Sequence, residues 1–352
     1  MVDSVHAGAA VADIKLLAAA DSARWDAFVA TAPQATFYHR AGWAEVIRRA
    51  FGHRTYFLYA ERDGVIEGIL PLARIRSFLF GDSLSSLPFC VCGGVVAANP
   101  EAAAALENRA IALARELQVD HLEFRNLVPR HPDWPRKDQL YVNFRKVLDP
   151  DPEKNMLAIP RKQRAMVRKG IEAGLLGEID QDISRFYPAY SESVRNLGTP
   201  VFSKKYFEIL REVFGADCEV LTITHNGRLI ASVLSFYFRD QVLPYYGGGT
   251  AAAREVKGND FMYWELMRRA TERGVRIFDY GRSKRDTGSY SFKKNWGFEP
   301  EPLHYEYVLV KAAAVPDVNP LNPKYERFVR LWKRLPLGVA QLLGPHLVKY
   351  LG

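Results

Sequence analysis

Alternating apolar and polar positions repeat one arrangement in the two halves of the chain. Residues 55–76, TYFLYAERDGVIEGILPLARIR, and residues 220–240, VLTITHNGRLIASVLSFYFRD, each predict two strands joined by a tight turn. The turns fall at Asp63–Gly64 and at Asn226–Gly227. Each hairpin is followed by a glycine-rich apolar segment, a helical pattern and another short strand. The sequence therefore predicts one fold used twice.

The helical patterns run from about Pro100 to Leu117 and from about Asp260 to Arg273. A hairpin, a third strand, a helix and a further strand predict an α/β fold in which helices cover a mixed sheet. We expect an amino-terminal domain, a carboxyl-terminal domain and a helical tail, over residues 1–150, 151–312 and 313–352.

Two segments are unusually basic. Residues 279–300, DYGRSKRDTGSYSFKKNWGFEP, combine basic side chains with glycines and aromatics, which suit close approach to an anionic ligand. In IPRKQRAMVRKGIEAGL, helical spacing puts Arg161, Arg164 and Arg168 on one stripe, with Lys162 and Lys169 on the next. Both segments predict a surface for an anionic ligand, and for both a solvated basic face is the alternative.

Charge and composition narrow the class of protein. The 352 residues carry a net charge of +8, which favours anionic partners. No apolar run reaches ~18 residues and the amino terminus lacks a secretory pattern, so we expect a cytoplasmic protein. Three cysteines, Cys90, Cys92 and Cys218, are no disulfide framework, and the eight histidines fall singly. We therefore expect no metal and no tightly bound cofactor.

The second half resembles a known family. The stretch YYGGGTAAAREVKGNDFMYWELMRRATERGVRIFDYGRSKRDTGSYSFKKNWGFEP resembles the signature of FemAB-related proteins, and FKKNWGFEP is similar to the last helix and turn of general N-acetyltransferases. The resemblance implies tandem acetyltransferase-like (GNAT-like) domains, the first more degenerate. The tail NPLNPKYERFVRLWKRLPLGVAQLLGPHLVKYLG resembles the type associated with PEP-CTERM and exosortase systems. The family implies an acyltransferase acting on peptidoglycan, exopolysaccharide or another cell-envelope precursor.

The expected reaction is direct transfer to an amine or hydroxyl group, because no Ser, His and Asp arrangement indicates a covalent nucleophile. The resemblance implies a donor used as a cosubstrate, either aminoacyl-tRNA, as in Fem-type enzymes, or acyl-CoA. The loop TAAAREVKGND lacks the Gly-x-Gly pattern usual in coenzyme A enzymes, and the chain lacks the coiled-coil arm of some Fem-type enzymes. The expected donor-binding residues are Arg254, Lys257, Gly258 and Asn259.

The family's Phe-Lys motif falls on Phe292 and Lys293, so the resemblance makes Lys293 the candidate that stabilises an oxyanion, with a surface lysine as the alternative. Asp279 either accepts the nucleophile's proton or pairs with a neighbouring arginine, and Tyr290 either contacts substrate or is a core tyrosine. We expect a cleft between the two domains, lined by segments 161–169, 245–260 and 282–293. Its expected substrate-binding residues are Arg161, Lys162, Arg164, Arg168, Tyr245, Tyr246, Arg282, Ser283, Lys284, Phe292 and Trp296.

The tail pattern indicates an amphipathic helix. One face carries Tyr325, Phe328, Val329 and Trp332, and the other carries Arg327, Arg330 and Arg334. Such a helix docks on the body or lies on an anionic membrane, so residues 320–352 predict a peripheral contact at the inner face of the membrane. Besides an enzyme with an anionic precursor and tRNA as partners, a non-catalytic basic binding or scaffold protein for nucleic acid, membrane or polysaccharide machinery is the alternative.

Overall fold

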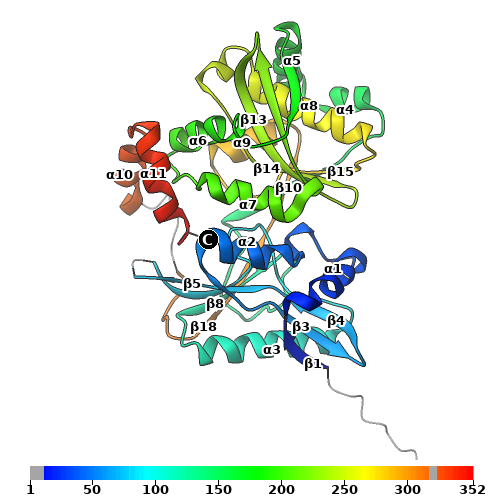
Figure 1. Cartoon of the computed structure of the whole chain (residues 1–352), viewed down its shortest axis with the longest axis vertical. Coiled ribbons are helices and arrows are strands. Elements are labelled where there is room, and N and C mark those ends of the chain that lie inside the picture. Colours follow the sequence, from blue (N-terminus) through cyan, green and yellow to red (C-terminus); the bar gives the residue numbers. More distant parts are fainter. Residues whose placement is uncertain (1–11, 79, 317–322, 352) are drawn as a thin grey trace, which may run out of the picture.

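The computed structural model describes residues 12–78, 80–316 and 323–351, with side chains in the tail from Arg327 onwards. Two lobes are stacked along the long axis, with the first half of the chain in one and most of the second half in the other (Figure 1). We call them the first unit and the second unit. Helices α10 (Pro323–Trp332) and α11 (Leu337–Val348) lie along one side of the second unit (Figure 1).

The first unit is built on the predicted hairpin, which bends at Pro71. Its turn, Asp63–Gly64, has φ angles of 50° and 80°, the left-handed conformation that two-residue hairpin turns require. Because proline lacks the N–H that a strand donates, the long hairpin divides into two sheets there. Their strand orders are β1-β3-β4-β7 and β2-β5-β6-β8-β18-β9. The bounds are Asp13–Leu16 (β1), Arg54–Thr55 (β2), Leu58–Arg62 (β3), Val65–Leu70 (β4), Leu72–Ser77 (β5), Gly81–Ser86 (β6), Val96–Ala97 (β7), His121–Asn126 (β8), Arg136–Lys137 (β9) and His304–Leu309 (β18).

The helices of the first unit are α1 (Ser22–Thr31), α2 (Gly42–Phe51) and α3 (Pro100–Glu116). The start of α3 follows from its sequence, since Pro100 needs no N–H partner at the first position and Asn99 Oδ1 accepts the Ala102 N–H at 2.8 Å. Leucines and alanines of α3 bury a core against β3, β5 and β8.

The second unit has one sheet, of order β11-β12-β13-β14-β15-β10-β16, with β17 paired to β10. Its hairpin turn, Asn226–Gly227, has φ angles of 49° and 74°, so both predicted hairpins are confirmed. The strands are Tyr141–Val147 (β10), Leu176–Asp180 (β11), Cys218–His225 (β12), Arg228–Phe238 (β13), Gln241–Gly249 (β14), Ile277–Asp279 (β15), Ser283–Lys284 (β16) and Glu299–Pro302 (β17). The helices are Pro152–Ala158 (α4), Arg161–Glu172 (α5), Phe186–Leu197 (α6), Lys204–Phe214 (α7), Gly258–Glu272 (α8) and Gly288–Asn295 (α9).

Each unit contains a strand from the other side of the expected division near residue 150. β10 precedes that division yet pairs with β15 and β17 of the second unit. β18 follows the whole second unit yet pairs with β8 of the first, from His304 opposite Asn126 to Leu309 opposite His121 (Figure 1). The buried Glu306 strengthens this return, because its carboxylate accepts hydrogen bonds from Asn126 Nδ2 at 2.7 Å and Arg130 N at 2.8 Å.

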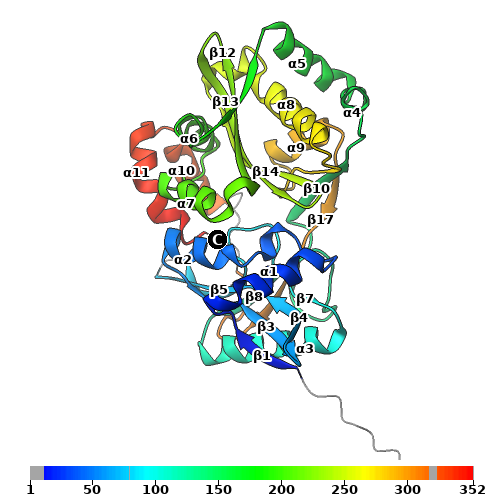
Figure 2. The same cartoon turned by 45° about the vertical axis from the view of Figure 1, so that its right-hand side comes forward.

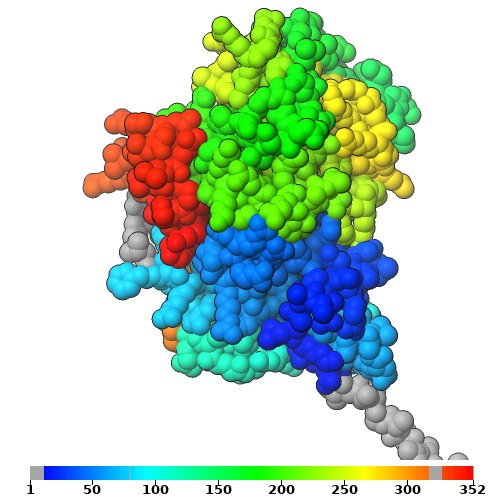
Figure 3. Space-filling model, in the orientation of Figure 1, coloured from blue at the N-terminus to red at the C-terminus, as the bar shows by residue number. Residues whose placement is uncertain are grey.

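A single apolar cluster joins the units. It contains Trp25 and Phe37 from the first unit and Phe186 and Phe236 from the second, and the space-filling view shows the lobes in direct contact (Figure 3). Phe37 stacks on Phe236 with ring centroids 4.4 Å apart. Within residues 12–78, 80–316 and 323–351, no helix is long and apolar enough to cross a membrane.

Candidate active site

The candidate site lies where β14 and β15 separate. These parallel strands pair only at Gln241 with Ile277 and at Val242 with Phe278, after which β14 continues to Gly249 while β15 ends at Asp279. On its other side β15 pairs with β10, so that Arg145 stands directly opposite Asp279. The carboxyl end of β15 is therefore held between strands from both halves of the chain.

Lys293 points from α9 to this strand end. Its Nζ donates to the carbonyl oxygens of Gly281 at 2.9 Å and Arg282 at 3.1 Å, which uses two of its three N–H donors. The side chain is 9% exposed, and burial lowers its pKa to about 7, with Asp279 opposing this effect and the charge of Arg282 adding to it. Lys293 therefore changes protonation near neutral pH.

Asp279 is held by three groups. Its Oδ1 accepts from Asn143 Nδ2 at 3.1 Å and from the Gly281 N–H at 2.9 Å, and its Oδ2 lies 3.4 Å from Arg145 Nε. Burial raises the pKa of this carboxyl, and Arg145 opposes the rise. Of the two roles that the sequence left open, the ion pair with a neighbouring arginine is present.

Arg282 connects the site to the first unit. Its guanidinium lies 4.6 Å from the centre of the Tyr141 ring and donates to the Tyr305 hydroxyl at 2.9 Å. Tyr305, on the exchanged strand β18, donates in turn to the Val91 carbonyl at 2.6 Å. Arg282, whose carbonyl is one of the two that accept from Lys293, is thus held through Tyr305 by the first unit.

Sequence reasoning missed Tyr141, Asn143, Arg145 and Tyr305. The alternation in YVNFRKV would have shown that the first three share one face of β10. It would not have shown which strand that face meets, because β15 lies more than a hundred residues away along the chain.

The other aromatic residues expected at the site, on α9 or directly after it, pack on the core of the second unit. Tyr290 packs edge-on against Phe144, with ring centroids 5.5 Å apart, and Phe292 packs half-buried on the core of the second unit. Trp296 has no exposed surface and donates its Nε1–H to Asp260 Oδ1 at 3.1 Å. The residue that the resemblance of FKKNWGFEP marked thus lies in the core of the second unit, and its expected contact with substrate stays a prediction.

Ser283 and Lys284 form β16 beside Tyr141. Ser283 is buried, and its hydroxyl has no hydrogen-bond partner within the described part of the chain. Lys284 Nζ lies 5.4 Å from the centre of the Tyr141 ring. Both residues thus lie next to Arg282, as their place in the sequence implies.

Tyr245 and Tyr246 face the junction of the units, where their hydroxyls already have partners. Tyr245 donates to the Phe89 carbonyl at 2.8 Å, and the Tyr246 hydroxyl lies 2.9 Å from that of Tyr206. Their rings belong to the shared apolar cluster. They hold the two units together, so a contact with substrate requires their hydroxyls to exchange partners.

The expected donor loop follows β14 and leads into α8. Gly258 is required for packing, since a Cβ there would lie 2.3 Å from Ile230 Cγ2. Lys257, at a φ of 60°, donates to the Arg254 carbonyl at 2.9 Å, and the Asn259 Oδ1 is buried without a partner among the described residues. Near the start of this loop the Ala251 N–H donates to Glu192 Oε1 at 2.9 Å, so a protein carboxylate already engages that amide.

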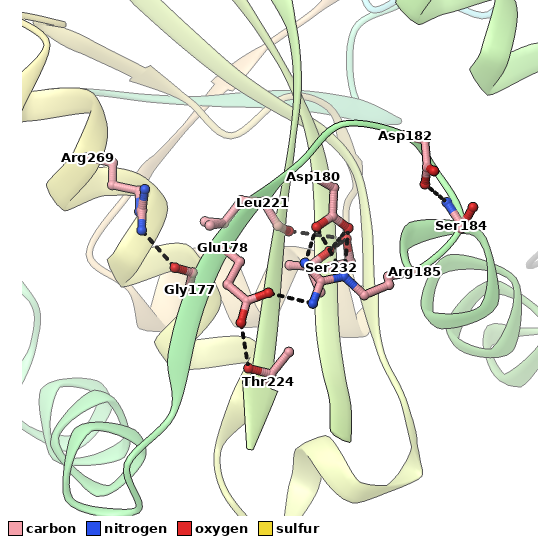
Figure 4. A network of polar contacts seen from close by, with 11 residues as sticks. Gly177, Glu178, Asp180, Asp182, Ser184, Arg185, Leu221, Thr224, Ser232 and Arg269 are labelled. Carbon is pink, nitrogen blue, oxygen red and sulfur yellow. Dashed lines mark hydrogen bonds and ion pairs between the residues drawn. The ribbon is translucent and has the colours of Figure 1, made fainter. Parts of the chain in front are cut away.

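A polar network at the β11 edge of the sheet surrounds the start of α6 (Figure 4). Arg185 reaches back from the start of α6 to Asp180 and donates to Glu178 Oε2 at 2.6 Å, and Thr222 donates to Asp180 Oδ2 at 2.8 Å. This network fixes the turn from β11 into α6, the helix that carries Glu192 and packs on β14.

The basic stripe on α5 has the predicted helical geometry. Arg161, Arg164, Arg168 and Lys169 line an open hollow of about 300 Å³, together with Ala165 and Glu172. Lys162 is exposed beside it. Because every lining residue belongs to α5, this hollow is not the expected cleft shared with segments 245–260 and 282–293. No group of His, Cys, Asp and Glu within the described ranges could hold a metal ion.

Comparison with known proteins identifies the fold. Residues 158–294 match the family described as the acetyltransferase (GNAT) domain, and Lys293 falls inside the match. A crystal structure of FemX is similar over 85% of this chain and 98% of that one, with a TM-score of 0.67 and 14% identity. None of the curated proteins compared with the chain matches it.

Two further solved structures share the architecture. A tandem GNAT protein from the clavulanic acid biosynthesis pathway covers 86% of this chain and all of its own, with a TM-score of 0.54 and 15% identity. The carboxyl-terminal domain of a protein described as a lysylphosphatidylglycerol synthetase from Agrobacterium fabrum covers 82% of this chain and 92% of its own, with a TM-score of 0.56 and 12% identity. The predicted mixed α/β fold with tandem GNAT-like units is confirmed.

Proposed function

We propose that the chain is an acyl- or aminoacyltransferase that modifies an amine or hydroxyl group of a cell-envelope or exopolysaccharide precursor by direct transfer. The observation that carries the proposal is the buried ammonium of Lys293, held at the end of β15 inside the region that matches the GNAT domain. The precursor as acceptor rests on the resemblance of the sequence to FemAB-related proteins, and the similarity to FemX supports it.

In such a transfer the acceptor nitrogen or oxygen attacks the carbonyl carbon of the donor, and the carbonyl oxygen becomes an oxyanion. The C–O or C–S bond to the leaving group then breaks, and the leaving group takes up a proton. Lys293 retains one N–H for the oxyanion, and burial strengthens that interaction relative to water. With a pKa of about 7, it is also able to pass a proton to the leaving group.

Asp279 takes a positioning role in this proposal. Its oxygens are occupied by Asn143, the Gly281 N–H and Arg145, and these bonds hold the backbone turn whose carbonyls orient Lys293. The proton of the attacking group then leaves to solvent or to the substrate itself.

The donor that we favour is an aminoacyl ester of tRNA, with acyl-CoA as the alternative. In coenzyme A enzymes the pyrophosphate sits on backbone amides at a helix amino terminus. Here the Glu192 carboxylate takes the Ala251 amide at the start of the loop that leads into α8, and its negative charge disfavours a pyrophosphate bound in this loop. The arginines that line the α5 hollow supply a separate anionic seat, suited to an RNA backbone or a precursor phosphate.

The test is transfer of a radiolabelled acyl group to a precursor that carries a free amine, with aminoacyl-tRNA in one arm and acetyl-CoA in the other. We expect Lys293→Ala to lower kcat by about 10²–10³ with little change in KM, as for the loss of one oxyanion donor. Lys294→Ala is the matched control, because Lys294 is exposed on the next position of the helix.

The outcomes separate the roles. Equal losses in the two variants, or a rise in KM alone for Lys293→Ala, would make Lys293 a binding residue. Absence of transfer from both donor classes would favour a binding or scaffold protein instead.

A further inference from the structure

A second basic hollow, of about 410 Å³, lies on the first unit beside the end of α11. None of its lining residues belongs to the site around Lys293. Arg54, Arg74 and Arg76 line it from the first unit, and Lys349 lines it from the tail. His53 fixes the tail at this point, because its Nε2 lies 2.5 Å from the Lys349 carbonyl oxygen. The hollow therefore exists only where tail and first unit meet.

Positive charge in this hollow exceeds negative charge. Among the residues that the structure describes, none that lines it is acidic. Asp82 lies behind it and is engaged by Arg74, whose Nε and Nη2 donate to the two carboxylate oxygens at 2.8 and 2.6 Å. Arg76, 3.9 Å from the same carboxylate, keeps 80% of its side chain exposed. Of the four cations that line the hollow, Arg74 and Arg76 share the Asp82 carboxylate, so positive charge is in excess and a bound anion would stabilise the arrangement.

Tyr56 also lines the hollow. It is 5% exposed, and its hydroxyl interacts with Arg74, which can only donate, so that the hydroxyl proton meets no acceptor in the part of the chain that the structure describes. Buried hydroxyls nearly always have partners. With Arg54 lying 5.1 Å from the centre of its ring, Tyr56 is placed to donate to an anionic oxygen that Arg54 also contacts.

The helix next to the hollow is apolar on two sides. Ala340, Gly344 and Val348 are buried against the body, where Gly344 allows contact with the backbone of Val201. The opposite side exposes Leu342 at 69%, together with Val339 and Leu343. An exposed helix side with several large apolar residues is usually covered by protein or lipid, and in this structure the outer side of α11 lacks such a cover among the described residues.

A second exposed apolar element lies on the same side of the molecule. Phe78, at the tip of the β5–β6 hairpin, is fully exposed and lies two residues after Arg76. In Figure 1 and in Figure 2 this hairpin projects from the same side of the molecule as α10 and α11. Figure 3 shows the hairpin, in cyan, as a protrusion just below the red tail helices. Exposed apolar groups therefore lie on both sides of the basic hollow.

We propose that this side of the molecule docks on an anionic membrane surface. The hollow formed by Arg54, Arg74, Arg76 and Lys349 binds the phosphate of a lipid headgroup, while Phe78 and the exposed side of α11 enter the boundary between headgroups and acyl chains. The positive charge of the hollow favours an anionic surface. The exposed apolar side chains beside it favour a lipid surface over a nucleic acid, because they can be buried among acyl chains but not in a nucleic acid. The proposal is independent of the acyl-transfer chemistry.

The experiment is co-sedimentation of the full chain with vesicles of phosphatidylglycerol and phosphatidylcholine, against vesicles of phosphatidylcholine alone. The charge variant is Arg54→Glu with Arg76→Glu, and the apolar variant is Phe78→Ser with Leu342→Ser; all four side chains are exposed, so the fold should be kept. The matched control reverses two exposed charges elsewhere, Arg115→Glu with Arg228→Glu. Melting temperatures verify that all variants are folded.

We expect the wild type and the control to bind the anionic vesicles, and both test variants to bind at least tenfold more weakly. Equal losses in the control would show that net charge alone acts, and would overturn the site. Failure of the wild type to bind anionic vesicles above phosphatidylcholine would overturn the docking. Binding of an RNA duplex that only the charge variant loses, without vesicle binding, would assign the hollow to nucleic acid and likewise overturn it.

Discussion

At the scale of single residues, the central feature is a lysine whose surroundings lower its affinity for a proton. The apolar faces of Phe144 and Tyr280 lie 5.7 and 5.5 Å from Lys293 Nζ, and two carbonyls accept its hydrogen bonds. These contacts compensate only part of the hydration that the ammonium loses on burial. Lys293 is thus held in a state that costs stability, which is frequent at functional sites.

The pH dependence of stability should reveal this cost. The folded pKa of Lys293 is about 7, whereas the unfolded chain has the ordinary value of 10.5, so the unfolded chain binds more protons between these values. The contribution of Lys293 to the free energy of unfolding should therefore rise by a few kcal/mol from pH 7 to pH 10. Urea unfolding of wild type and Lys293→Met at pH 6, 8 and 10 measures it. We expect the wild type to gain on the variant as pH rises, and parallel curves would contradict the assigned pKa.

At the scale of elements, the junction between β14 and α8 depends on close packing. The amino terminus of α8 lies against β13, and the absence of a side chain at Gly258 makes room for Ile230. The structure thus gives Gly258 a role in packing the helix against the strand, whereas the sequence analysis expected Gly258 to contact the donor. The packing role can be measured as a change in stability, without any ligand.

Gly258→Ala should destabilise the protein by about 1–3 kcal/mol, because the added methyl group would overlap Ile230 Cγ2 in a packed core. Chemical denaturation at constant pH gives the change in free energy. Gly288→Ala is the control: a Cβ at that helix start meets nothing within 4 Å, so we expect a change within about 0.5 kcal/mol. Similar losses at both positions would mean that helix starts, and not the contact with Ile230, set the effect.

At the scale of the whole molecule, the exchanged strands and the shared cluster make each unit depend on the other. A fragment of residues 1–150 would lack β18 and leave β10 without its sheet. The buried Glu306 would also be absent, so Asn126 and the Arg130 amide would lose their acceptor.

Unfolding of the full chain should therefore be a single cooperative transition. We expect differential scanning calorimetry to show one peak in which the calorimetric and van't Hoff enthalpies agree. Fragments 1–150 and 151–312, produced separately, should give far-ultraviolet circular dichroism of largely unfolded chains. Two resolved peaks, or a folded fragment 1–150, would contradict the dependence between the units.

What the sequence determined by itself is local. The two hairpin turns, the cap of α3, the course of α8 and the stripe on α5 follow from side-chain period and from residues next to one another, so their positions could be read directly. The Phe-Lys motif likewise pointed to Lys293 through a resemblance. The pKa of that lysine and its two carbonyl partners could not be predicted, because they depend on Gly281 and Arg282 folding back over α9.

What only the tertiary structure decided is which distant segments meet. The pairing of Arg145 with Asp279, the return of β18 to the first unit and the burial of Trp296 involve residues that are far apart in sequence. So does the hollow that Lys349 completes with Arg54 and Arg76. A strand's alternation states which side chains share a face but carries no information on the partner strand, since backbone hydrogen bonds are the same for every sequence. Packing of the whole chain makes that choice, and with it the environment that gives each side chain its chemistry.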